Sequence, residues 1–430
     1  MLLARERVVI HNVIVGAGTM SAGVLGVAFQ SLVSHRLHPA DYGEVFAVLT
    51  VITLIGLPAS AFTLLMARES SRDRATGRYA ASSALLRGGN RAVLLAGTAL
   101  AVALLLLTPV LVRFLEVPPN LLMAAAAGIP FALALPLLLG EFQGEQRFLA
   151  FAVLSTGQAA LKLVGAVALG SIWGPLGIIA GVSLAGAATY FLALSMLRHK
   201  LSIRPRLGWW RPAAAYLAVV LPSTLALGVL LSADVLLVKH FFPSGLAGEY
   251  AAVAALGRAI FWGASGVSAV LFPKVVFRGA RGQSGTPIVA ASLVLVGLGG
   301  LAGLALLSLG SHWLLVGFAG SAYGEAAGYL PWYSIGMILL GVAAVLIATL
   351  QSRGKAGFLA VLIPLMALEP ILILVFHHTL WQVVGAVDVS MALVAGGLGA
   401  LYLVQERSTS LTGADVVGGV SSPTSVAQVG

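Results

Sequence analysis

Long apolar segments alternate with short polar connections along the whole chain. Each apolar segment has about 20 residues or more, the length that a helix needs to cross a bilayer core about 30 Å thick. Their boundaries predict twelve spans, at residues 10–33, 43–66, 91–114, 121–141, 148–171, 175–197, 212–238, 247–274, 286–318, 326–350, 356–376 and 383–404. Lipid offers the backbone no hydrogen-bond partner, so helices are the expected form. The pattern predicts an all-α, polytopic membrane protein whose long segment 286–318 tilts or ends in an interfacial turn.

Positive charge falls almost entirely on every second connection. The two ends of the chain and the even-numbered connections hold 20 of the 25 Lys and Arg residues. The odd-numbered connections hold only Arg36, Arg113 and Lys239. Lys and Arg accumulate in cytoplasmic loops, so the bias predicts a multi-pass cell-membrane protein with both termini in the cytoplasm. The net charge of +10 follows from this bias. Short loops without a soluble module argue against nucleic-acid binding and leave membrane lipids as the surroundings.

Composition adds two points to this pattern. The chain is 59% hydrophobic and 9% charged, and it has no cysteine, which excludes disulfides and thiol chemistry. Residues 405–430 are rich in Ser, Thr, Gly and Val with little charge, and we predict a disordered cytoplasmic tail there.

The chain repeats itself at about half its length. A proline turn followed by Gly43-Glu44 opens the second span, and a similar turn followed by Gly248-Glu249 opens the eighth. Six spans separate the matched segments, so the two halves should be parallel, as in many transporters whose substrate path lies between the repeats. We therefore predict two six-helix bundles around a central cavity. Their expected ranges are 1–197 and 212–404, joined by a cytoplasmic linker at 198–211.

Lys162 lies in the middle of the fifth predicted span. In a helix, Ser155, Gln158 and Lys162 fall on one face. Charged side chains at this depth are costly and often functional. One interpretation is that this face lines a wet lumen, with Gln158 and Lys162 as substrate ligands. The other is that Lys162 pairs with a carboxylate for packing, for which Glu369 in the eleventh span is a candidate.

Arg258 lies about three turns into the eighth span and shares a helical face with Trp262. A guanidinium group presents a planar fork that binds phosphate through two hydrogen bonds. Arg258 is thus either a cavity-lining cation beside Trp262 or the structural partner of Asp234 or Glu249.

Three further sets of polar residues lie within spans. Asp234, near the outer end of the seventh span, is either a coupling-ion or proton site or an interfacial partner of Lys239. Glu369 either carries protons or pairs with Lys162. The first span carries Asn12 and Gln30 in a stripe of small residues, which serves as a cavity wall or as a tight packing face.

The connections exclude several classes of enzyme. All predicted external connections are short, and no phosphate-binding loop or paired metal-ligand motif occurs. We expect no catalytic residue, no metal and no cofactor. The remaining role is transport across the bilayer, for which an ion gradient is a candidate source of energy.

Several short segments together resemble the polysaccharide-export flippases (Wzx-type) of the multidrug/oligosaccharidyl-lipid/polysaccharide superfamily. The resemblance covers about residues 8–404. It is carried by Asp41-Tyr42-Gly43, Pro58, Gln143-Gly144-Glu145-Gln146-Arg147-Phe148, Asp234-Val235-Leu236-Leu237, Ala247-Gly248-Glu249-Tyr250-Ala251 and Leu271-Phe272-Pro273.

This resemblance implies alternating access and a polyprenyl-pyrophosphate-linked oligosaccharide moved from the inner to the outer leaflet. Polysaccharide polymerase and glycosyltransferases would be its partners. The expected substrate-binding residues are Lys162, Arg258, Asn12, Gln30, Gln158 and Trp262, and the expected ion-coupling residues are Asp234 and Glu369. The alternative is a cation-coupled multidrug exporter of the same superfamily, because those relatives also have twelve helices.

Overall fold

The computed structural model describes residues 2–76, 79–202, 211–279, 286–352 and 356–418. No strand occurs among these residues. The first half of the chain contains α1 (Leu2–Arg36), α2 (Pro39–Gly56), η1 (Leu57–Ala59), α3 (Ser60–Thr76), α4 (Tyr79–Leu115), α5 (Pro119–Gly144), α6 (Phe148–Trp173), α7 (Pro175–Met196) and η2 (Lys200–Ser202). The second half contains α8 (Arg211–Leu230), α9 (Ala233–Phe241), α10 (Ser244–Gly279), α11 (Thr286–Leu309), α12 (Ser311–Ala319), η3 (Ser321–Tyr329), α13 (Leu330–Ser352), η4 (Ala356–Phe358), α14 (Leu359–Val375) and α15 (Leu380–Gly418).

The helices match the predicted spans. Within the described part of the chain, ten helical segments are long and apolar enough to cross a membrane. They coincide with ten of the twelve predicted spans. The other two predicted spans lie within α1 and α10, continuous helices of 35 and 36 residues. The prediction of an all-α, polytopic membrane fold is confirmed.

Three of the predicted spans are interrupted. The second bends at η1, where Pro58 cannot donate a backbone hydrogen bond. The seventh coincides with the segment Ala213–Phe241, but its helix breaks between α8 and α9, where Ser232 leaves helical geometry with φ −133°. The ninth ends in the short helix α12 after Gly310, the terminal turn expected for so long a segment.

The C-terminal end differs from expectation. Residues 405–418, predicted to be disordered, continue the last span as helix α15. Gln405, Glu406 and Arg407 have favourable helix propensities and extend a helix that is already nucleated in the span. Residues 419–430 of the predicted tail, and residues 203–210 of the predicted linker, lie outside the described residues.

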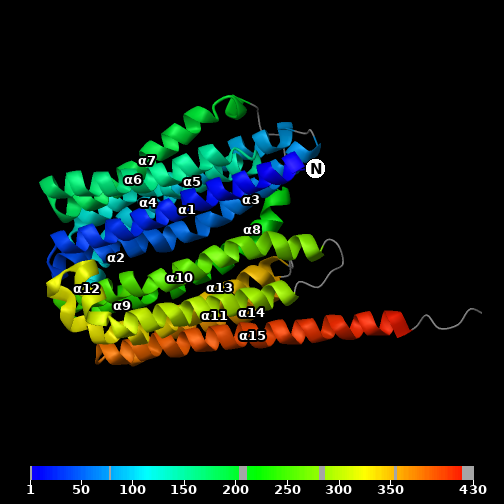
Figure 1. The fold of residues 1–430 in the computed structure, drawn as a ribbon. Helices are drawn as coiled ribbons and strands as arrows, with labels where there is room; N and C mark the ends of the chain where they lie inside the picture. Colours follow the sequence, from blue (N-terminus) through cyan, green and yellow to red (C-terminus); the bar gives the residue numbers. More distant parts are fainter. Residues whose placement is uncertain (1, 77–78, 203–210, 280–285, 353–355, 419–430) are drawn as a thin grey trace, which may run out of the picture.

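The helices pack mainly within each half of the chain. In the first half, α5 contacts α3, α4 and α7, while α6 lies between α1 and α7. In the second half, α13 contacts α10, α11 and α15. Figure 1 shows the two halves as two layers of roughly parallel helices. Between the halves, α2 packs on α10, and α8 packs on η1 and α3. The superposition of one half on the other stays a prediction.

Candidate functional site

A buried ion pair lies at the centre of the second half. Arg258 Nη2, from α10, lies 2.9 Å from Asp234 Oδ1, from α9. Asp234 is 1% exposed and Arg258 is 9% exposed. The break between α8 and α9 starts a new helix immediately before Asp234, so its carboxylate lies in that helix's first turn, where the backbone dipole favours negative charge.

Two tyrosines complete this cluster. The Tyr333 hydroxyl, from α13, donates to Asp234 Oδ2 at 2.9 Å and accepts from Arg258 Nε at 3.1 Å. The Tyr250 hydroxyl donates to the same carboxylate oxygen at 3.0 Å. Sequence analysis did not select either tyrosine. A usable signal was present, because a tyrosine deep in an apolar span needs a hydrogen-bond partner for its hydroxyl.

This geometry supports the structural interpretation of Arg258. Of the two carboxylates considered, Asp234 is its partner, and Asp234 does not pair with Lys239. In this conformation the positive charge of Arg258 is neutralised by Asp234. Removing one partner of a buried pair leaves the other uncompensated, which typically costs about 3–5 kcal/mol.

Glu369, in α14, lies beside this cluster without joining its hydrogen bonds. It is fully buried, and neither carboxyl oxygen has a hydrogen-bond partner among the described residues. It interacts electrostatically with Asp234 and Arg258, and the Asp234 backbone N–H approaches it outside hydrogen-bonding geometry. No ion pair joins Glu369 to Lys162 in the described structure, so that predicted pairing is absent.

Lys162 has a different environment, in the first half. Its Nζ lies over the Phe29 ring, 4.0 Å from the centroid, and the residue is half-buried. Among the described residues no carboxylate forms a salt bridge with it. Gln158 lies one turn away on the same helix and is also half-buried. Lys162 is therefore a deep cation whose charge is not neutralised by a neighbouring side chain.

The remaining predicted ligands are dispersed. Gln30 accepts a long hydrogen bond of 3.5 Å from the Tyr42 hydroxyl. Tyr42 packs on Phe46, and Phe46 lies under the Arg258 guanidinium, 5.6 Å from the ring centroid. These contacts connect Gln30 to the Asp234 cluster through α2. Trp262 is 51% exposed and its ring contacts that of Phe261. The side chain of Asn12 lies outside the described residues.

The repeated Gly-Glu segments pack the two halves together at one end of the molecule. A Cβ atom on Gly248 would lie 1.6 Å from the Pro39 carbonyl oxygen, and one on Gly43 would lie 3.0 Å from the Gly248 nitrogen. Nearby, the Tyr323 hydroxyl donates to the Leu37 carbonyl at 3.1 Å. Only glycine permits this approach of α2 to α10, so this end is closed.

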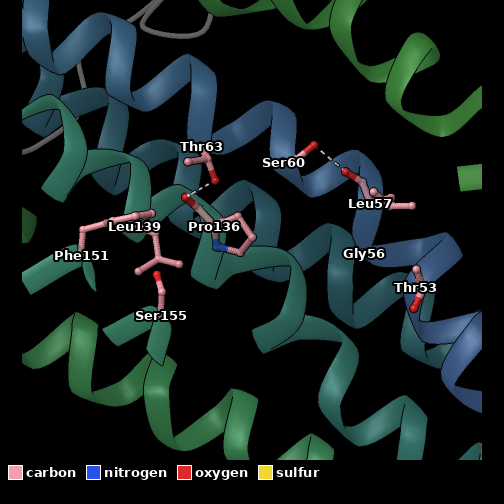
Figure 2. A pocket seen from close by; sticks show the side chains of 9 residues that line it. All are labelled: Thr53, Gly56, Leu57, Ser60, Thr63, Pro136, Leu139, Phe151 and Ser155. Carbon is pink, nitrogen blue, oxygen red and sulfur yellow. Dashed lines mark hydrogen bonds between the residues drawn. The ribbon is translucent and has the colours of Figure 1, made fainter. Parts of the chain in front are cut away.

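An open pocket of about 390 Å³ lies in the first half. Figure 2 shows it between the bent α2–η1–α3 segment, α5 and α6. Ser155, on the polar face of α6 predicted to line a lumen, is one of its lining residues. In the part of the chain that the structure describes, no group of three or more His, Asp or Glu is placed to hold a metal ion.

Comparison with known proteins identifies the fold. No protein-family model matches the chain, and no curated protein matches it by sequence. Among solved structures, an inward-facing multidrug resistance MATE family transporter of the MOP superfamily is similar, with a TM-score of 0.73, 13% identity, and coverage of 91% of this chain and 95% of that one. The lipid II flippase MurJ, in an inward closed conformation, has a TM-score of 0.70 and 13% identity, with 91% and 87% covered.

A third similar structure shows a MATE transporter in another conformation. An outward-facing MATE family transporter has a TM-score of 0.64 at 14% identity, with 94% and 96% of the chains covered. The chain thus has the fold of MATE transporters and of MurJ, and the inward-facing MATE structure is the more similar of these two MATE conformations.

Proposed function

We propose that this chain is an alternating-access exporter that moves a polyprenyl-pyrophosphate-linked oligosaccharide from the inner to the outer leaflet of the cell membrane. The observation that carries the proposal is Lys162, a cation at mid-depth of α6 without a carboxylate partner among the described residues. The fold shared with a lipid II flippase and with MATE transporters supports a transport role.

The chemistry of Lys162 favours an anionic substrate. A pyrophosphate cannot cross hydrocarbon unaided, and a fixed ammonium group in a partly dry cavity would offset its charge. Hydrogen bonds to charged groups contribute about 1.5–3 kcal/mol each. Loss of one such bond weakens binding by roughly 10- to 150-fold. The prenyl tail would stay in lipid while the headgroup and the sugars cross between the two halves.

The alternative is a multidrug exporter for cationic compounds. It is favoured by the similarity to MATE transporters, but it requires accessible carboxylates. Asp234 is neutralised by Arg258, and Glu369 is enclosed with no exposed surface. In the first half, Lys162 lies in the middle of α6 and forms no salt bridge with a described carboxylate. An anionic lipid headgroup fits this arrangement better than a cationic drug does.

Glu369 and Asp234 are our candidates for ion coupling. Both carboxyl oxygens of Glu369 are buried without a hydrogen-bond partner among the described residues, so the gain or loss of a proton there would change the charge next to Asp234 and Arg258. Release of the proton would create a second carboxylate beside Arg258 and would compete with Asp234 for the guanidinium. Proton transfer at Glu369 would in this way bias the packing of α9, α10 and α14.

The proposed direction of transport depends on topology. Both termini and residues 144–147 are expected on the cytoplasmic side, and residues 115–120 outside. The chain has no cysteine, so single-cysteine variants need no background removal. Asn120→Cys should react with an impermeant maleimide in intact cells, and Gln146→Cys only after permeabilisation. The reverse pattern would contradict the orientation. Glycosyltransferases and a polysaccharide polymerase would act on either side of the transport step.

The decisive assay is glycan export in a strain that lacks its own flippase, with the amount of membrane protein measured alongside. The wild-type chain should restore export. Lys162→Ala should abolish it at normal abundance, and Lys162→Arg, the matched control that keeps the charge, should retain part of it. Full export by Lys162→Ala, or resistance to cationic drugs without glycan export, would contradict the proposal.

A further inference from the structure

The pocket of the first half has a specific pattern of hydrogen-bonding groups. Three of its four hydroxyl groups already donate their single proton to backbone carbonyls: Thr53 to Leu49 at 2.9 Å, Ser60 to Leu57 at 2.7 Å and Thr63 to Pro136 at 2.9 Å. Each of these oxygens is left as an acceptor. The fourth hydroxyl, on Ser155, has no hydrogen bond to another described residue. Most of the pocket surface is carbon, and its few polar atoms are these three acceptors and the Ser155 hydroxyl, which can both donate and accept.

The rest of the pocket wall is apolar. Leu57, Pro136, Leu139 and Phe151 supply carbon surface, and none of the lining residues is charged. Figure 2 shows Phe151 and Ser155 on one side of the pocket and Ser60 on the other. A ligand that fits this wall carries hydroxyl donors at its edge and carbon-bound hydrogens on its faces. A pyranose ring has this combination.

Two helix bends create the space. Pro58 replaces regular helix by η1, and Pro136 removes a backbone donor inside α5. The bent helices are held together at Gly140, where a Cβ atom would lie 2.4 Å from the Thr63 carbonyl oxygen. The pocket is thus built into the fold of the first half. Its volume of about 390 Å³ lies within the usual range of ligand pockets, about 300–1,000 Å³.

The pocket and Lys162 share one helix face. Ser155 precedes Lys162 by seven residues, which is two turns, or about 10 Å along α6. A pyrophosphate and the first sugar ring attached to it have a comparable length. A headgroup bound at Lys162 would therefore place its first sugar beside Ser155 and Phe151.

We propose that this pocket binds the uncharged sugar ring attached directly to the pyrophosphate of the transported lipid. The proposal rests on the proposed function, because it takes Lys162 as the pyrophosphate ligand. It adds a specificity: a first sugar with a carboxylate would find no cation in the pocket and would be bound more weakly.

The test measures binding of two probes to the purified full-length chain in nanodiscs. One probe is a polyprenyl pyrophosphate, and the other is the same lipid carrying one N-acetylhexosamine. Ser155→Leu fills the pocket with a larger apolar side chain. Ser171→Leu is the matched control, since Ser171 lies on the same helix, is exposed and does not line the pocket. Thr53→Val removes one acceptor with little change of shape.

Ser155→Leu should weaken binding of the sugar-bearing probe at least about tenfold and leave the bare pyrophosphate probe within about twofold. Thr53→Val should weaken only the sugar-bearing probe, by about 2- to 10-fold, the usual contribution of one hydrogen bond. Ser171→Leu should change neither. Equal loss of both probes in Ser155→Leu, or loss of neither, would overturn the pocket assignment.

Lys162→Ala separates this inference from the proposed function. If it weakens both probes while Ser155→Leu weakens neither, the headgroup site stands and the sugar pocket fails. If Lys162→Ala weakens neither probe, the headgroup assignment fails, and a sugar-specific effect of Ser155→Leu would then stand by itself.

Discussion

Lys162 and Arg258 are both single cations inside predicted spans, yet the two halves of the molecule treat them differently. Arg258 is buried in a network with Asp234, Tyr250 and Tyr333, in which its Nε donates to Tyr333 and its Nη2 is paired with Asp234. Lys162 is half-buried and rests on the face of Phe29. A charge at membrane depth is therefore not by itself a binding group; its partners decide whether it is free to bind.

Under the proposed function, this difference would give the two halves separate tasks. In the second half, Arg258 is paired with Asp234, and Glu369 is our candidate for the coupling proton. In the first half, Lys200 is paired with Glu141 and Glu145, whereas Lys162 forms no salt bridge with a described carboxylate. A substrate headgroup would thus bind the first half, while the coupling event would occur in the second.

The largest effect should follow from breaking the balanced pair. Arg258→Ala leaves Asp234 charged, buried and uncompensated, which should destabilise the protein by about 3–5 kcal/mol. Membrane abundance and the melting temperature of the purified protein should both fall. The double variant Asp234→Asn with Arg258→Gln should recover most of the loss, because neither charge remains. Normal abundance of Arg258→Ala would show that the pair is not needed for stability.

A smaller effect should follow from removing the tyrosine that bridges the pair. Tyr333→Phe loses one hydrogen bond to Asp234 and one from Arg258, and each bond to a charged group contributes about 1.5–3 kcal/mol. Tyr250→Phe is the matched control, since it loses a single bond to Asp234. Thermal unfolding should therefore rank Tyr333→Phe below Tyr250→Phe and both below wild type. The opposite order would remove Tyr333 as the bridging residue.

Closure of the two halves should be sensitive to one methyl group. Gly248→Ala would place a Cβ atom 1.6 Å from the Pro39 carbonyl oxygen, so the closed end must open. A single cysteine introduced at Leu37, in the connection between α1 and α2, should become more reactive in this variant. Gly245→Ala is the matched control, because no atom lies within 4 Å of a Cβ atom there. Equal reactivity in the two variants would contradict the closed-end assignment.

The smallest effect on stability should come from Lys162. Lys162→Ala breaks no ion pair among the described residues and loses only the contact with Phe29, worth about 0.5–2 kcal/mol. Its melting temperature should stay near that of wild type, well above that of Arg258→Ala. A loss as large as that of Arg258→Ala would indicate a structural role and would remove the contrast between the halves.

The fold was predictable because its signals are local. Length, hydropathy and alternating charge define each span without reference to any other, and Pro58 marks its own bend. The break at Ser232 was missed because no proline or glycine marks it. The pairing of Asp234 with Arg258 joins residues 24 positions apart, and Tyr333 lies 75 positions beyond Arg258, on another helix. Such contacts depend on how the helices pack. The sequence therefore could not show whether Arg258 pairs with Asp234, pairs with Glu249 or lines a cavity.

The central claim is that Lys162 binds the anionic headgroup while the Asp234–Arg258 pair does not. The most direct measurement is the affinity of the purified chain in nanodiscs for polyprenyl pyrophosphate. Lys162→Ala should bind it roughly 10- to 150-fold more weakly than wild type, the loss expected for one bond between charged groups. The double variant Asp234→Asn with Arg258→Gln should stay within about threefold of wild type. Unchanged affinity in Lys162→Ala together with a large loss in the double variant would contradict the claim.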